Sequence, residues 1–96
     1  MTTPTIAPDT VPRIAPLYRF QWEEAQNCHV LLYPEGMVRL SGSAGEILKR
    51  IDGRTSVSQL LDDLRATFPG VDLDRDVYSF LETAYERGWL RTVVAQ

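Results

Sequence analysis

The 96-residue sequence is poor in the side chains on which most catalytic and metal sites depend. His29 is the only histidine and Cys28 the only cysteine, so no site with two imidazole ligands and no intramolecular disulfide can form. The six glycines are dispersed along the chain and do not form a phosphate-binding loop. The simpler interpretation is that His29 and Cys28 are ordinary strand residues. The functional alternatives are a base or metal ligand for His29 and a reactive thiol for Cys28. We therefore expect no catalytic residues, no metal site and no cofactor.

Long apolar stretches are also missing. No apolar run approaches the roughly 18 residues that a membrane-spanning helix needs. The N-terminus lacks a basic segment followed by an apolar one, which is the pattern of a secretion signal. From these absences we predict a cytoplasmic protein with no membrane partner.

Positive charge is scarce where a nucleic-acid-binding protein would need it. The chain has 10 Lys and Arg against 13 Asp and Glu, a formal net charge of −3. Between residues 62 and 88, seven acidic residues stand against three basic ones, a local net charge of −4. Because DNA carries one negative charge per roughly 1.7 Å of its axis, it would repel a recognition helix from this segment. We expect no nucleic-acid partner.

The residues that are present begin with proline. Four of the six prolines, Pro4, Pro8, Pro12 and Pro16, lie in the first sixteen residues. Proline has no amide hydrogen and disfavours helix in the residue before it, so the sequence predicts an extended, mobile arm over residues 1–16. A partner-binding or strand-exchanging arm is the functional alternative. In a chain with 44% hydrophobic residues, the remaining residues, 17–96, are expected to form one small domain.

Strand signals follow the arm. From position 17 onward, alternation places Tyr18, Phe20 and Trp22 on one face, which is typical of a strand with one side buried. A second strand is predicted over residues 28–33 and a returning strand over residues 37–40. These segments predict a small antiparallel sheet.

The segment Tyr33-Pro34-Glu35-Gly36 connects the last two predicted strands. The fixed φ of proline suits the first central position of a type I turn. We expect a three-residue loop in which Gly36 takes a positive φ and forms a G1 bulge.

Three helical segments are predicted after the strands. Ser43 and Glu46 have the spacing of a capping box at the start of the first helix. After the third helix, a last strand is predicted over residues 92–94. The order of elements predicts an α+β, winged-helix-like fold: a small N-terminal antiparallel β-sheet of about three strands followed by a three-helix bundle. The other helix boundaries follow from capping residues, glycine and proline; they are Gly53 for the first helix, Thr55 or Ser56 and Pro69-Gly70 for the second, and Asp72 or Asp74 and Gly88 for the third.

The returning strand and the third helix together indicate a peptide-binding function. An edge strand exposes unpaired amides and carbonyls, to which a peptide can add as a further strand. Tyr78, Leu81 and Tyr85 recur at helical spacing and could line a groove beside that edge. The alternative, which the residues leave open, is that Leu81 is a core residue on which the tyrosines pack. One face of the strand that carries Val38 and Leu40 must likewise serve the core.

Several short motifs resemble the pyrroloquinoline quinone (PQQ) biosynthesis protein D family. Leu-Leu-Tyr-Pro-Glu-Gly at residues 31–36, Asp52-Gly53 and Gly88-Trp89-Leu90 occur at the spacing of that family, and the resemblance covers about residues 12–92. Ser41 stands where the family more often has asparagine, and Ser43 is expected to supply the helix cap. The further matching positions are Leu40, Ala44, Ile47-Leu48, Asp76-Val77 and Phe80-Leu81.

The resemblance implies a non-catalytic peptide chaperone, the recognition element of a modified-peptide pathway. Such a protein binds the ribosomally made precursor peptide of PQQ and presents it to a radical S-adenosylmethionine (SAM) enzyme, which links a glutamate and a tyrosine of the peptide. The alternative function is a general protein-interaction module of a regulatory complex. The sequence is compatible with either a monomer or a strand-exchanged dimer. By analogy with the family, the residues expected to bind the peptide are Met37, Val38, Arg39 and Leu40 of the returning strand and Asp76, Val77, Tyr78, Leu81 and Tyr85 of the third helix.

Overall fold

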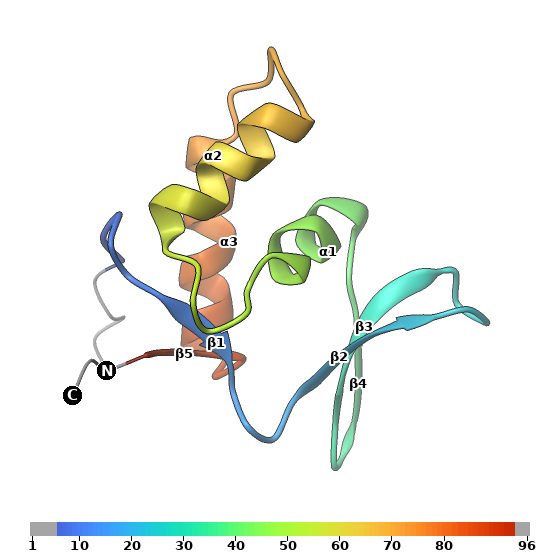
Figure 1. The fold of residues 1–96 in the computed structure, drawn as a ribbon. Coiled ribbons are helices and arrows are strands. Elements are labelled where there is room, and N and C mark those ends of the chain that lie inside the picture. Colours follow the sequence, from blue (N-terminus) through green and yellow to red (C-terminus); the bar gives the residue numbers. More distant parts are fainter. Residues whose placement is uncertain (1–5, 94–96) are drawn as a thin grey trace.

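The computed structural model describes residues 6–93 and confirms the predicted α+β fold (Figure 1). An antiparallel sheet of three strands precedes three helices, and α1 lies between that sheet and the α2–α3 pair. Within the described residues, no helix has the length and apolar character to cross a membrane. The elements are β1 (Pro12–Ile14), β2 (Arg19–Glu23), β3 (Cys28–Tyr33), β4 (Gly36–Arg39), α1 (Gly42–Lys49), α2 (Val57–Thr67), α3 (Asp74–Glu86) and β5 (Leu90–Thr92).

The three-stranded sheet has the order β2-β3-β4, so β3 is central and β4 is an edge strand. Its register places Phe20, Leu31 and Val38 in one row, because Leu31 pairs with both of the others. Leu31 is fully buried, and Phe20 and Val38 are partly buried against the hydrophobic core. The predicted period-two alternation is thus confirmed, with one face of the sheet turned to the core.

The β3–β4 turn differs from the prediction. Tyr33 pairs directly with Gly36, which leaves a loop of two residues, Pro34 and Glu35. Gly36 does not have a positive φ, so the expected G1 bulge is wrong. The physical reason is that both central residues of a type I turn have negative φ, and Gly36 can enter the strand at once.

The N-cap of α1 is also different from the prediction. Ser41 has an extended backbone, and its Oγ accepts a hydrogen bond from the amide of Ala44 at 3.1 Å. Ser43 lies inside the helix, and the carboxylate of Glu46 binds Arg50 instead of closing a capping box. The chain leaves β4 directly into the helix, so the serine nearer to the strand takes the capping position.

At the start of α2 the predicted cap is confirmed at Ser56. The Ser56 hydroxyl accepts from the amide of Gln59 at 3.1 Å, and the Gln59 side chain accepts from the amide of Ser56 at 2.9 Å. The first two helical amides of α2 donate to carbonyls of the N-terminal segment, Val57 to Thr10 and Ser58 to Pro8, both at 2.8 Å. The N-terminal segment therefore satisfies amides that would otherwise lack partners.

Of the two predicted starts of α3, the structure has Asp74, and Leu73 takes the N-cap position without a side-chain hydrogen bond. Gly88, with a φ of 81°, follows the end of α3 as predicted. A glycine there allows the left-handed conformation that turns the chain toward β5.

A second, two-stranded sheet joins the two ends of the described chain. In it β1 pairs with β5, and Ile14 lies opposite Leu90. We expected a mobile arm at these N-terminal residues, but Pro12 is fully buried and the amide of Ala15 donates to the carbonyl of Trp89 at 2.8 Å. The arm is therefore anchored at this end, because the sheet and the core hold it. Its division from a domain of residues 17–96 stays a prediction.

The predicted last strand over residues 92–94 overlaps β5 only at Thr92, since β5 begins at Leu90. Val94, like Pro4 of the predicted arm, lies outside the described residues.

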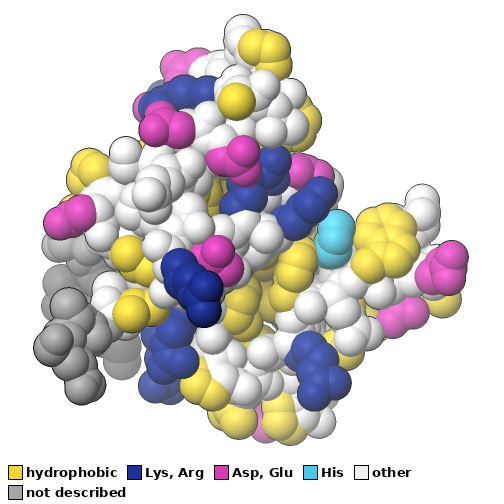
Figure 2. All heavy atoms as spheres, viewed as in Figure 1, with side chains coloured by type: hydrophobic (Ala, Val, Ile, Leu, Met, Phe, Trp, Pro, Cys, Tyr) yellow, Lys and Arg dark blue, Asp and Glu magenta, His cyan; other side chains and the backbone are white. Residues whose placement is uncertain are grey.

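His29 lies in an aromatic cluster at the junction of the sheet and α1. Its ring stacks on Phe20 with centroids 4.8 Å apart and meets the edge of Trp22 at 5.0 Å. Trp22 remains 51% exposed, and Figure 2 shows hydrophobic side chains exposed on the sheet beside mixed charges on the helices. Gly45 of α1 faces this cluster, because a Cβ added to it would come within 2.9 Å of His29 Nδ1.

Replacing Gly45 with alanine should therefore destabilise the protein by about 1–3 kcal/mol, since the stacked imidazole cannot move aside without breaking its contacts. Gly42→Ala is the matched control: it lies in the same helix, and nothing is within 4 Å of an added Cβ. We expect this control to be neutral or more stable by up to about 1 kcal/mol. Urea unfolding of both variants measures the difference. Equal stability of the two would contradict the close contact with His29.

Candidate functional site

The outer edge of β4 is an open site for strand addition. Among residues 6–93, no strand pairs with β4 except β3. The amide of Leu40 donates to the carbonyl of His29 at 3.0 Å, so Leu40 and, by alternation, Val38 direct their backbone groups toward β3. The amides and carbonyls of Met37 and Arg39 consequently point away from the sheet. This open edge (Met37–Arg39) offers two donors and two acceptors to an extended peptide.

The side chains of β4 divide between two faces. Val38 is half-buried and Leu40 is buried, both on the face that packs on the core. Met37, 41% exposed, and Arg39 lie on the outer face. A strand added at this edge would continue the same division, with alternate side chains directed toward the core face and the outer face.

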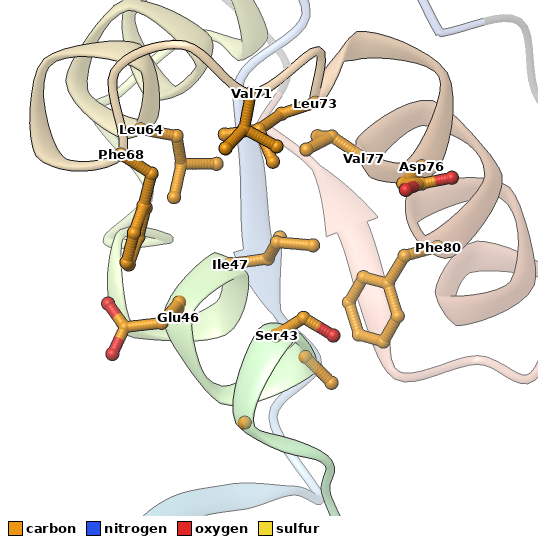
Figure 3. A pocket seen from close by; sticks show the side chains of 12 residues that line it. Ser43, Glu46, Ile47, Leu64, Phe68, Val71, Leu73, Asp76, Val77 and Phe80 are labelled. Carbon is orange, nitrogen blue, oxygen red and sulfur yellow. The ribbon is translucent and has the colours of Figure 1, made fainter.

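A groove of about 560 Å³ opens close to the end of this edge (Figure 3). It begins at Gly42, three residues after Arg39, so an extended segment along β4 reaches it within about 10 Å. We call it the helix groove, because its walls come from α1, the end of α2 and the first half of α3. Its lining residues are Gly42, Ser43, Ala44, Glu46, Ile47, Leu64, Phe68, Val71, Leu73, Asp76, Val77 and Phe80.

The helix groove is apolar inside and acidic at its rim. Figure 3 shows Ile47 at its centre, with Phe80 pointing from α3 toward the start of α1. Val71, 55% exposed, lies in the α2–α3 loop and leaves apolar surface uncovered. The carboxylates of Glu46 and Asp76 are the only charged groups in the lining. Such a groove suits apolar side chains of a bound peptide.

Arg50 holds together the two groove walls formed by α1 and α2. Its guanidinium donates to Glu46 Oε1 at 2.8 Å and to Asp63 Oδ2 of α2 at 2.6 Å, and its side chain is only 13% exposed. The hydrogen bond from Arg50 lowers the pKa of Glu46 below its ordinary value. Glu46 therefore remains ionised at neutral pH and keeps its ion pair with Arg50.

The structure brings together some of the predicted site residues and separates others. Asp76 and Val77 line the helix groove, close to the end of the open edge of β4. Leu81 is 0% exposed and is therefore a core residue. This is the alternative to a groove position that the sequence left open. Tyr85 is also buried, and its hydroxyl forms a 2.8 Å hydrogen bond with Thr92. Tyr78 packs half-buried against the core and is absent from the groove lining.

Helical periodicity explains why these side chains lie apart. Val77 and Leu81 form the centre of the buried stripe of α3, while Tyr78 and Tyr85 lie on one flank of it. Asp76 and Phe80, four residues apart, lie on the other flank, which faces the groove. Burial of the Tyr85 ring raises the pKa of its hydroxyl, as expected for a structural tyrosine.

The groove contains residues that the sequence did not reveal as site residues. In the sequence, Phe80 and Ile47 stand out only as positions that match the family, and Phe68 and Val71 carry no signal of a site. The one available signal was the spacing of Phe80 from Asp76. Among residues 6–93, no three His, Cys, Asp or Glu side chains converge as a metal site would require.

Comparison with known proteins identifies relatives of this chain. The family described as Coenzyme PQQ synthesis protein D (PqqD) matches residues 28–90. The chain is 50% identical over 91 residues to the PqqA binding protein of Pseudomonas aeruginosa (strain UCBPP-PA14), which covers 94% of this chain and 97% of that protein. It is 52% identical over 81 residues to the PqqA binding protein of Azotobacter vinelandii, with coverage of 83% and 88%.

A solved structure shares the fold. It is the solution NMR structure of the PqqD truncation of Methylobacterium extorquens PqqCD, a recognition element for ribosomally synthesised and post-translationally modified peptides. Its TM-score to this chain is 0.70 at 30% identity, covering 91% of this chain and 95% of that chain. Matches of this identity and coverage establish the relationship that the sequence motifs predicted, and the chain belongs to the PqqD family.

Proposed function

We propose that this chain is a non-catalytic recognition element that binds the precursor peptide of PQQ by adding it as a strand to β4. The observation that carries the proposal is the open edge of β4 with its unpaired backbone groups, three residues along the chain from Gly42 of the apolar helix groove. Relatives of this chain are named PqqA binding proteins, which supports the same ligand class. Because a ribosomal precursor peptide is made in the cytoplasm, the chain would act there.

The peptide would run along Met37–Leu40 and insert apolar side chains into the helix groove beside Asp76, Val77 and Phe80. Four backbone hydrogen bonds at the edge would each contribute about 0.5–1.5 kcal/mol. Two or three buried apolar side chains would each add about 1.5–3 kcal/mol. After the costs of association and of ordering the peptide, a binding free energy of about −8 kcal/mol corresponds to micromolar affinity.

The bound peptide would then be presented to a modifying enzyme, in this pathway a radical SAM enzyme. The solved relative is the PqqD part of a longer chain, PqqCD, which supports action beside pathway enzymes. The contribution of this chain would be proximity, because a bound peptide has a high effective concentration at an enzyme docked on the same protein.

Isothermal titration of the purified chain with the precursor peptide, and with a scrambled peptide of the same composition, tests the proposal. We expect saturable binding of the precursor at micromolar or tighter affinity and none of the scrambled peptide. Equal binding of both peptides would instead favour a general interaction module. If the precursor fails to bind both alone and in the presence of the radical SAM enzyme, the proposal is wrong.

A further inference from the structure

We propose that Arg39 selects precursor peptides that carry an acidic residue at the position facing it on the added strand. This inference rests on the proposed addition of a peptide to β4, and it specifies one side-chain contact of that complex. The contact is between charges on the outer face of the sheet, and it is separate from the apolar contacts in the helix groove.

Arg39 stands at the open edge with its side chain on the outer face. It is exposed, and it pairs with Val30 of β3, which in turn pairs with Gln21 of β2. Its neighbour on the same face of β4 is Met37. None of these neighbours carries a carboxylate, so nothing in the surrounding register compensates the guanidinium.

Within residues 6–93, Lys49, Arg50 and Arg65 form ion pairs, whereas Arg39 is one of seven arginines that form none. Among these seven, Arg39 is the one that lies on β4, at the open edge. An arginine presents five N–H donors in a planar fork that matches a carboxylate. Arg39 therefore keeps this capacity for a partner that arrives at the edge.

Strand addition would bring such a partner within reach. Side chains that face each other across an antiparallel pair have Cβ atoms about 4.5–5.5 Å apart, and opposite charges there attract. The residue facing Met37, two positions away on the same face, would be uncharged. The residue between them faces Val38, and the residue on the other side of the acidic one faces Leu40; both would be apolar. The selected peptide thus has an apolar core-facing side and an acidic residue on its outer side.

Charge reversal on both partners tests the contact. The probes are the precursor peptide and versions in which each Asp or Glu is replaced singly by Asn or Gln, and then by Lys at the sensitive position. The proteins are the wild type, Arg39→Glu and the control Arg19→Glu. Arg19 is also exposed and lies on the same face but belongs to β2, the far edge of the sheet, roughly 10 Å from β4.

We expect one amide replacement to raise the dissociation constant of the wild type about two- to fivefold. Arg39→Glu should bind the original peptide more weakly still and should recover affinity for the lysine version. Arg19→Glu should behave like the wild type at ionic strengths of about 0.15 M, because the distance exceeds the Debye length.

If the precursor binds but no carboxylate position is coupled to Arg39, the inference is wrong while the proposed function stands. If Arg19→Glu has the same effect as Arg39→Glu, only the general charge of the sheet matters, and a specific contact is again excluded. Failure of the wild type to bind any version, both alone and in the presence of the radical SAM enzyme, would overturn both the inference and the proposed function.

Discussion

The variant Met37→Pro should fold normally and lose at least four-fifths of its affinity for the precursor peptide. The amide of Met37 points away from β3, so proline there removes no hydrogen bond of the existing sheet. It does remove a donor to the added strand, and its ring occupies the space in front of the edge. Leaving a peptide carbonyl unpaired costs about 1–3 kcal/mol, which corresponds to a loss of roughly five- to 150-fold.

Met37→Ala is the control, because it shortens the side chain and keeps the amide. We expect its affinity to stay within about threefold of the wild type, since Met37 is exposed on the outer face. Titration calorimetry measures affinity, and thermal melts should place the stability of both variants within about 1 kcal/mol of the wild type. Wild-type affinity in a folded Met37→Pro protein would show that the peptide does not use this edge.

The largest effect on stability is expected for Leu81→Ala. Leu81 is fully buried in the core together with Val77, so its truncation leaves a cavity that the surrounding helices cannot fill. Such replacements cost about 2–5 kcal/mol, and each kilocalorie lowers the melting temperature of a domain of this size by about 4–8 °C. Urea unfolding gives the free energy directly.

The variant Phe80→Ala is the comparison that distinguishes the effect of a groove residue from that of a core residue. Phe80 is only half-buried, lines the helix groove and lies 6.4 Å from Trp89 between ring centroids. We expect it to lose less stability than Leu81→Ala and more peptide affinity, when both are measured where each protein is fully folded. If folded Leu81→Ala binds the peptide more weakly than Phe80→Ala does, Leu81 contributes to peptide binding and not only to the core.

The strands and helices were predictable because their signals are local. The alternation around Phe20, the Ser56 cap and the terminating Gly88 each depend on residues within a few positions of one another. The cap of α1 was assigned to the wrong serine because Ser41 and Ser43 are both good capping residues. Only the backbone conformation at the end of β4 distinguishes them.

Contacts between distant segments were not predictable in the same way. The pairing of β1 with β5 joins residues nearly the whole chain apart, and no pattern within either segment specifies its partner. The sequence therefore predicts a mobile N-terminal proline-rich segment. In the structure, however, Pro12 is buried and the carbonyls of Pro8 and Thr10 accept hydrogen bonds from α2. The prolines predict an extended chain, which the structure has at β1, but they do not reveal the strand that pairs with it.

The sequence by itself determined the order of the three sheet strands and the three helices, the edge position of the returning strand and, through its motifs, the family. Tertiary structure decided which flank of α3 faces the binding groove. Tyr78 and Tyr85 flank the buried stripe on one side, and Asp76 and Phe80 flank it on the other. Helical periodicity defines both flanks equally well, because it depends only on residue spacing. The packing of α1 and α2 beside Asp76 and Phe80 makes that flank the wall of a groove.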